Sequence, residues 1–371
     1  MKRTFLVIFF VHLVCTITAQ VLVRENHLLY SINPNGSNEA TIIGNEISEP
    51  IFLDIPATIT YQDVVYTVRV IDNEAFKDNQ NLYSVTIPSS VKEIGKQVFQ
   101  NCGKLKHVVL SDSLKSIGEA AFMKCPLIEK VDLPDDLLSL PNYTFSNCCN
   151  LSDVKLPDNL KDIGDFTFMG CESLKSISFP ESIEKLGDGS FHSCGLIEVT
   201  LPKSMTLIPP RLFNSCRSLK KIDIPETVTE IGEYAFTDSG LESIIFPQNL
   251  NKIGSHAFKG CSRLTDLNLP DNLEVLGDRV FFNCDELKSV HIPKNIKALG
   301  TSCFYGCYAI KTIEYLNPSP SEITEYNNNT IFPDIVYRQA TLYVTQYAKQ
   351  KINQGYGIHP WNKFDNLKVK Y

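Results

Sequence analysis

One phenylalanine returns every 22 or 23 residues along most of this chain. It does so eleven times, at Phe76, Phe99, Phe122, Phe145, Phe168, Phe191, Phe213, Phe236, Phe258, Phe281 and Phe304. A period of this length means that one small structural unit is repeated, and that neighbouring units stack to bury a core that no unit encloses alone. The chain of 371 residues is therefore predicted to be a solenoid, whose function resides on a long repeated surface.

Aligned on this phenylalanine, the repeats read L-x-x-V-x-I-P-x-x-V-x-x-I-G-x-x-A-F-x-x-C, and residues 82–102 show nearly every position. Alternating β-branched residues around Val85 predict a strand, which the following proline ends, and a short second strand is expected after that proline. The segment that ends at Cys102 is expected to form one helical or 3₁₀ turn, because Pro141 and Pro209 replace the glycine at its start. The predicted fold class is an α/β repeat solenoid, a right-handed coil with a stacked parallel β-sheet face.

Nine of the twelve cysteines stand three residues after the repeated phenylalanine, at Cys102, Cys125, Cys148, Cys171, Cys194, Cys216, Cys261, Cys284 and Cys307. Equivalent side chains of stacked repeats point the same way, whereas a disulfide requires two Cβ vectors that face each other. We therefore predict a buried ladder of free thiols. A metal site is not expected, because the chain supplies no C-x-x-C pair with nearby histidines. Cys149 stands outside the ladder and is expected to be more exposed.

The ends of the chain differ from the repeats. Residues 1–19 read as a signal peptide, with Lys2 and Arg3 before an apolar run that is too short to span a bilayer. The segment before Cys15 lacks the small residue of a lipoprotein signal, so lipidation is not expected. The mature protein is therefore predicted to be exported, and to be either secreted or held on a cell surface.

The mature chain is predicted to have three parts. Residues 20–70 form an N-terminal cap with hairpins at Asn35–Gly36 and Gln62–Asp63, and residues 71–316 form about 11 repeats. Residues 317–371 form a C-terminal cap, in which Trp361 closes the open end of the core.

The unit I-P-x-x-V-x-x-I-G-x-x-A-F-x-x-C-x-x-L resembles the BspA-like, or Treponema pallidum-type, leucine-rich repeat over about residues 70–316. The tail, with N-P-S-P, T-L-Y-V and W-N-K-F, is similar to the C-terminal caps of such proteins from gut and oral Bacteroidetes. The resemblance implies a leucine-rich repeat fold in an exported surface protein. Members of this family are often regarded as adhesins, although most have no defined ligand.

The sequence offers no catalytic set, and an enzyme is not predicted. The histidines lie in different repeats or caps, and His192 and His256 are expected to be solvated turn residues. Nucleophile, zinc-protease and phosphate-binding motifs are absent, so no cofactor is expected. The net charge of −7 argues against nucleic acid or an anionic membrane as the main partner. Membrane insertion is not predicted, because no stretch after the signal peptide is long and apolar enough to cross a bilayer.

The outward residues of the sheet face are polar, of mixed charge and without aromatic rings. If this face binds a protein, its central stretch is the predicted site, at Lys130, Asp132, Asp153, Lys155, Glu198, Lys221 and Asp223. The loop that contains Tyr326 is a second candidate, because loops carry binding residues more often than scaffolds do. A solvated face without a partner is the plain alternative.

Three functions are weighed from the sequence, of which an exported enzyme is the weakest because no nucleophile–base arrangement is present. The first is a monomeric recognition or adhesion module that binds a host or bacterial surface protein. The second is a glycan-binding or nutrient-capture accessory protein of the cell surface, which surface tyrosines would support.

Overall fold

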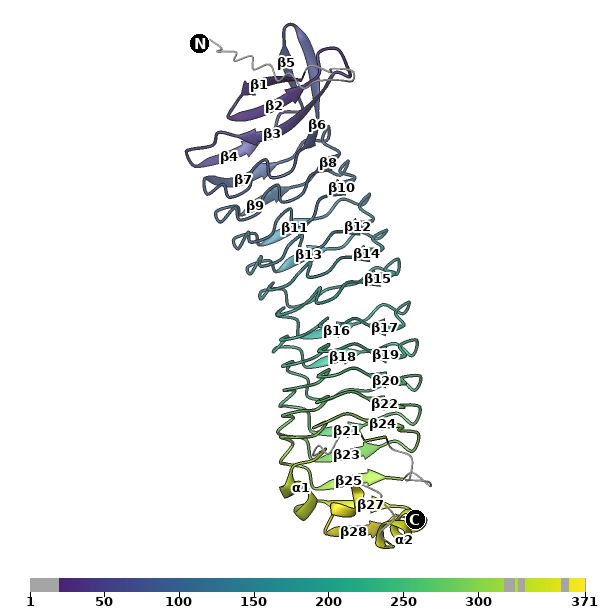
Figure 1. Cartoon of the computed structure of the whole chain (residues 1–371). Helices are drawn as coiled ribbons and strands as arrows, with labels where there is room; N and C mark the ends of the chain where they lie inside the picture. Colours follow the sequence, from purple (N-terminus) through teal and green to yellow (C-terminus); the bar gives the residue numbers. More distant parts are fainter. Residues whose placement is uncertain (1–19, 317–323, 326–330, 355–359, 371) are drawn as a thin grey trace, which may run out of the picture. The chain divides into compact units, whose positions relative to one another are not determined.

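The computed structural model of the protein describes residues 20–316, 324–325, 331–354 and 360–370. The predicted signal peptide, Tyr326 and His359 lie outside these residues. The chain divides into two compact units, unit 1 up to Leu174 and unit 2 from Lys175. Each unit is a stack of parallel β-solenoid rungs, one rung per repeat, as the period predicts (Figure 1). The predicted division into signal peptide, caps and repeats stays a prediction.

Unit 1 begins with hairpins and continues as rungs. Its strands are β1 (Val21–Glu25), β2 (Leu28–Ile32), β3 (Glu39–Asn45), β4 (Ile51–Asp54), β5 (Thr58–Tyr61), β6 (Val64–Ile71), β7 (Leu82–Thr86), β8 (Glu93–Ile94), β9 (His107–Val109), β10 (Ser116–Ile117), β11 (Lys130–Asp132), β12 (Ser139–Leu140), β13 (Asp153–Lys155) and β14 (Asp162–Ile163). The antiparallel pairs β2–β3 and β5–β6 are the two predicted hairpins. A third hairpin, β1–β2, precedes them.

Two parallel ladders run along the rungs of unit 1. The strand before each proline builds the outward sheet, in which β4, β7 and β9 pair in order and β11 pairs with β13. The predicted second strands, such as β8 and β10, are only two residues long and build the other ladder. In this ladder β6 pairs with β8 and β8 pairs with β10, both in parallel. Equivalent residues of neighbouring repeats lie opposite each other, as Val85 and Val108 do.

Unit 2 repeats this plan and adds the helices. Its elements are β15 (Lys185–Leu186), β16 (Glu198–Thr200), β17 (Leu207–Ile208), β18 (Lys221–Asp223), β19 (Glu230–Ile231), β20 (Lys252–Ile253), β21 (Asp266–Asn268), β22 (Val275–Leu276), β23 (Ser289–Ile292), β24 (Ala298–Leu299), β25 (Thr312–Tyr315), β26 (Thr324–Glu325), α1 (Asp334–Gln339), β27 (Thr341–Val344), α2 (Gln346–Asn353), the 3₁₀ helix η2 (Trp361–Lys363) and β28 (Asn366–Val369).

The outward sheet of unit 2 extends past the recognisable repeats, because β27 and β28 join β21, β23 and β25 in one parallel sheet. The T-L-Y-V segment of the tail forms β27, and the helix α2 follows it. Trp361 is fully buried and stacks on Tyr315 with ring centroids 4.3 Å apart, so it closes the core as predicted.

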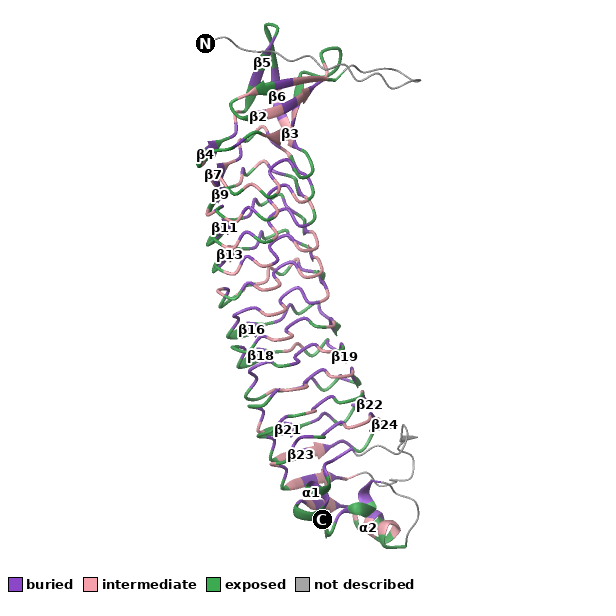
Figure 2. Ribbon diagram, turned by 60° about the vertical axis from the view of Figure 1, so that its left-hand side comes forward, coloured by how far each residue is buried: buried purple, intermediate pink, exposed green. Residues whose placement is uncertain are grey.

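The repeated phenylalanines form the core of both units. All eleven rings are fully buried. Successive rings stack, with centroids 5.2–5.7 Å apart from Phe76 to Phe168 in unit 1. In unit 2 the spacing is 5.0–6.0 Å, and Phe332 continues the stack beyond Phe304. Buried and exposed segments therefore alternate around each rung (Figure 2).

The cysteine ladder is made of free thiols, as predicted. Eight of the nine ladder thiols also make a hydrogen bond that the sequence does not reveal, because each donates to the backbone carbonyl of the phenylalanine in the preceding rung. The Cys102 Sγ lies 3.1 Å from the Phe76 oxygen, and the Cys307 Sγ lies 2.9 Å from the Phe281 oxygen. Small donors can replace cysteine for this reason, and Ser239 in the ladder lies 3.3 Å from the Cys261 thiol.

The predicted helical or 3₁₀ turn before each cysteine is wrong. In the rung of Phe99, two consecutive tight turns are closed by Gln100 N–Gln97 O at 3.1 Å and Cys102 N–Phe99 O at 3.2 Å. Gln97 and Asn101 hold left-handed φ values of 56° and 59°, which a helix excludes.

The glycine that starts this segment is favoured for a reason other than a positive φ. Gly118 does not adopt a positive φ, as the proline substitutions implied. A Cβ at Gly118 would lie 2.3 Å from the carbonyl carbon of Gly95 in the preceding rung. The glycine is therefore favoured by the close approach of neighbouring backbones.

Candidate recognition surface

Four of the predicted site residues meet on the outward sheet of unit 1. The parallel register places Lys130 opposite Asp153 and Asp132 opposite Lys155. The Lys130 Nζ lies 3.2 Å from Asp132 Oδ1 and 3.5 Å from Asp153 Oδ2. The hydrogen bond and charge of Asp132, and then the charge of Asp153, raise the pKa of Lys130. These exposed groups balance each other's charge and remain accessible to a partner.

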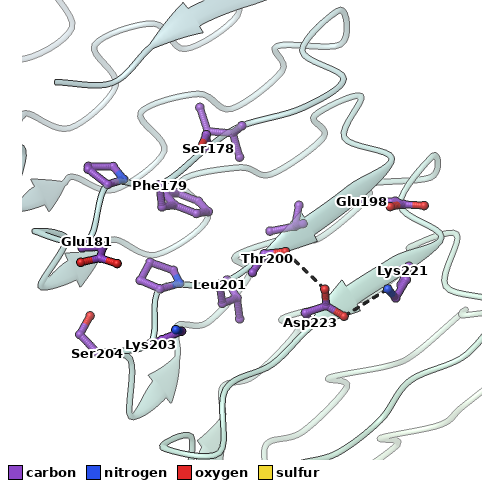
Figure 3. A pocket seen from close by; sticks show the side chains of 14 residues that line it. Ser178, Phe179, Glu181, Glu198, Thr200, Leu201, Lys203, Ser204, Lys221 and Asp223 are labelled. Carbon is purple, nitrogen blue, oxygen red and sulfur yellow. Dashed lines mark hydrogen bonds and ion pairs between the residues drawn. The ribbon is translucent and has the colours of Figure 1, made fainter. Parts of the chain in front are cut away.

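The other three predicted residues meet in unit 2, on β16 and β18. Glu198 lies opposite Lys221, and the Lys221 Nζ lies 3.4 Å from Asp223 Oδ1. Thr200, which the sequence analysis did not select, donates from Oγ1 to Asp223 Oδ2 at 3.3 Å. Figure 3 shows Asp223 in contact with both Thr200 and Lys221, while Glu198 is only a register neighbour of Lys221. The four residues Glu198, Thr200, Lys221 and Asp223 are called the β16–β18 patch below.

A pocket of about 580 Å³ opens beside this patch. Besides the patch itself, its lining includes Phe179, Pro180, Pro202 and Lys203 (Figure 3). Residues 175–180 form no strand, so β16 has only β18 as a partner within unit 2. The pocket thus combines charged groups with apolar walls, as binding sites do.

Phe179 is an additional aromatic residue in the rung that borders this pocket. Its ring packs edge-on against Phe191, with centroids 5.6 Å apart and an interplanar angle of 81°. The rung of Phe258 has the same arrangement, with Phe246 edge-on at 5.7 Å, and it also lacks the outward strand. A second pocket of about 350 Å³ lies there, next to Ile245, which is 84% exposed.

Aromatic rings lie on the outward surface of the predicted caps, outside the repeat strands to which the sequence prediction applies. Phe52 on β4 is 73% exposed and lies 6.1 Å from Tyr83. Tyr343 on β27 is half-buried opposite Glu314. The predicted site residues lie away from these strands, so the rings do not enter either patch.

The histidines do not form a shared site. His291 Nδ1 lies 3.5 Å from Glu314 Oε2. His192 and His256 are half-buried, so the prediction that they are solvated turn residues is wrong. The Nδ1 atom of each is buried and has no hydrogen-bond partner among the described residues. Burial lowers the pKa of both, helped by Arg211 near His192 and by Arg279 and Lys259 near His256.

The buried ladder thiols are poor nucleophiles. Burial raises the pKa of Cys102, Cys216 and Cys261 to about 12, so these thiols stay protonated and weakly nucleophilic. Cys149 is half-buried. Within the described ranges, no cluster of histidine, cysteine or acidic side chains could hold a metal ion. None of the helices described is long and apolar enough to cross a membrane.

Comparison with known proteins gives a family-level match. The model of the family described as "BspA type Leucine rich repeat region (6 copies)" matches residues 45–157, 69–196, 138–265 and 251–339. No curated protein matches the chain.

Several solved structures share the fold. A leucine-rich repeat protein of Bacteroides ovatus is 23% identical, with a TM-score of 0.56, over 94% of this chain and 100% of that one. A leucine-rich cell surface protein of Faecalibacterium prausnitzii is 24% identical, with a TM-score of 0.60, over 95% of each chain. The pneumococcal vaccine antigen PcpA is 22% identical, with a TM-score of 0.61, over 94% and 98%.

Proposed function

The chain belongs to the BspA-type leucine-rich repeat family, and from this premise we propose that it is an exported, non-enzymatic recognition protein that binds a protein ligand at the cell surface. The β16–β18 patch and its pocket carry the proposal. Charged side chains on regular strands surround an opening of about 580 Å³ with apolar walls. A rigid scaffold that holds polar and apolar groups together suits a protein ligand.

The patch is preorganised for binding. Asp223 is held between Thr200 and Lys221, so its carboxylate is fixed before a partner arrives. Glu198 stands beside Lys221 in the register and leaves a second carboxylate at the pocket rim. A partner that presents a cation to this rim and an apolar side chain to Phe179 would use both properties of the pocket.

Two further observations favour a surface location. The predicted signal peptide supports export, although it lies outside the described residues. The protein of similar fold from Faecalibacterium prausnitzii is described as a cell surface protein, and PcpA as a vaccine antigen. Both descriptions suit a chain that meets other cells or host proteins.

The test is a binding assay of the mature chain on an array of purified extracellular-matrix and bacterial surface proteins. We expect saturable binding to at least one protein, and a loss of about tenfold in affinity for Glu198→Gln combined with Asp223→Asn. The matched control is Glu129→Gln with Glu274→Gln, which removes two exposed, ion-paired carboxylates elsewhere.

Two results would contradict the proposal. Equal loss in the patch variant and the control would show that only net charge matters. Binding to a glycan array with no binding to any protein would favour the glycan-capture function instead.

A further inference from the structure

The tight turns around the core phenylalanines of unit 2 carry an unusual set of side chains. Two residues before the core ring, the backbone is left-handed at Arg211, Tyr234, His256 and Arg279, with φ between 52° and 61°. Large side chains seldom adopt this conformation, because it brings Cβ close to the following carbonyl oxygen. Backbone strain of this kind often accompanies functional surfaces.

These side chains form a continuous row. The Arg211 guanidinium lies 5.2 Å from the centre of the Tyr234 ring, and the Tyr234 and His256 rings stack at 4.7 Å with an angle of 5°. Arg279 occupies the same position in the next rung.

A second row adjoins the first. Lys259 and Phe282 close the turns that begin at His256 and Arg279. The Lys259 Nζ lies 6.0 Å from the Phe282 ring centre, and Phe282 stacks on the 41% exposed Tyr305. The six residues Arg211, Tyr234, His256, Lys259, Arg279 and Phe282 are called the turn ladder below.

The cations of the turn ladder differ from the lysines of the sheet face. Lys130 and Lys221 each have a carboxylate within 4.0 Å, whereas Arg211, Lys259 and Arg279 have none in the part of the chain that the structure describes. Of the two acidic residues near His256, Asp278 already accepts hydrogen bonds from the Thr301 backbone and hydroxyl at 2.7 and 3.0 Å, and Glu233 is exposed.

Two cations and two carboxylates act on the pKa of His256. The cations that lower the pKa of His256 outrank the acidic residues that raise it, and Arg211 acts in the same direction on His192. Arginine and tyrosine together are the side chains most enriched at protein hot spots. The exposed guanidinium groups of Arg211 and Arg279 are therefore available to carboxylates of a partner.

We propose that the turn ladder binds an extended acidic segment of a protein partner, with carboxylates on Arg211, Lys259 and Arg279. The inference rests on the proposed function, because it specifies a second surface for a protein ligand. Arg211 and Arg279 are three rungs apart, about 14 Å, which an extended peptide covers with about four residues.

The ring geometry favours a peptide over a sugar. Stacking covers one face of Tyr234 and one face of His256, and the Arg211 guanidinium lies over the Tyr234 ring, whereas a sugar would need exposed faces. The ring edges remain, and they carry the positive part of the aromatic quadrupole, which attracts carboxylates.

The test uses a fluorescein-labelled poly-glutamate peptide, a matched poly-glutamine peptide and a labelled heparin fragment. Binding to the full chain is followed by fluorescence anisotropy at low and at physiological ionic strength. We expect the poly-glutamate peptide to bind, and Arg211→Gln with Arg279→Gln to weaken it about tenfold or more. The control, Lys106→Gln with Lys297→Gln, makes the same change in net charge at ion-paired lysines and is expected to change affinity by less than about twofold. Circular dichroism verifies that both variants fold.

Three outcomes would overturn the inference. The first is equal weakening by both double variants, and the second is binding of the heparin fragment without the peptide. In the third, a protein binds through the β16–β18 patch, and Arg211→Gln with Arg279→Gln leaves its affinity unchanged whether that protein is acidic or neutral. That third result would leave the proposed function intact, so the two failures are distinguishable.

Discussion

Phe258→Ala tests the role of the stacked rings most severely. The ring is fully buried, with Phe236 at 5.1 Å on one side and Phe281 at 5.4 Å on the other. Phe246 packs edge-on at 5.7 Å. Truncation of a buried phenylalanine typically costs 3–5 kcal/mol, and each aromatic pair adds about 0.5–1.5 kcal/mol beyond burial.

The neighbouring rings cannot close the cavity easily, because backbone hydrogen bonds fix each rung. The Phe258 N–Val280 O distance is 2.9 Å, and the Phe236 N–Ala257 O distance is 2.7 Å. We therefore expect a loss near the upper end of the range, about 5 kcal/mol in the free energy of unfolding.

The assay is equilibrium urea unfolding of the mature chain, followed by far-UV circular dichroism and by the fluorescence of Trp361, the single tryptophan. Trp361 is buried in unit 2 and therefore reports on the same unit as Phe258. The control is Phe52→Ala, which removes a 73% exposed ring and should change stability by less than about 0.5 kcal/mol. A loss below about 1 kcal/mol for Phe258→Ala would refute the account of the core.

Two further predictions concern the packing of rungs and the thiols. Gly300→Ala should destabilise unit 2 by about 1–3 kcal/mol in urea unfolding, because the new Cβ would lie 2.2 Å from the Gly277 carbonyl. The control is Gly44→Ala, whose Cβ would have a leucine methyl at 3.4 Å as its nearest neighbour, and its effect on stability should be close to zero. Equal effects would contradict the backbone contact. Burial raises the pKa of Cys216 and Cys261 from 9.0 to about 12. The unfolded chain therefore loses these protons first, and stability that is complete below about pH 9 should fall by about 1.4 kcal/mol per thiol per pH unit up to about pH 12. A urea midpoint that stays constant from about pH 8 to 10 would be inconsistent with buried thiols.

The core of this protein could be predicted from the sequence, because one repeated interaction dominates it. Stacked repeats place equivalent residues opposite each other, so the period of Phe99 and its equivalents fixes both the spine and the parallel register. The free thiols followed from the same geometry. Phe332 was missed because the chain between it and Phe304 is longer than one repeat.

The turns could not be predicted in the same way. A proline at the start of the segment excludes a positive φ only at that residue, and Pro141 says nothing about Tyr143 two residues later. Side chains as large as Tyr143 are poor indicators of a left-handed backbone. The helical interpretation therefore failed where tertiary stacking overrides local preference.

The candidate site was predicted in part. Alternation along the strands identified Lys221 and Asp223 as outward residues, and the structure brings them together. The pocket was not foreseeable, because it depends on the missing strand at 175–180. The turn ladder had a sequence signal, since Tyr234 and His256 recur at the repeat interval, but the interval alone does not indicate exposure.

The most direct test of the stacked architecture is site-resolved thiol labelling of the folded protein, read by mass spectrometry. We expect Cys149 to react while the buried ladder cysteines stay unmodified until the chain unfolds and then all react as free thiols. Rapid labelling of several ladder cysteines in the native protein, or their recovery as disulfides, would contradict the account.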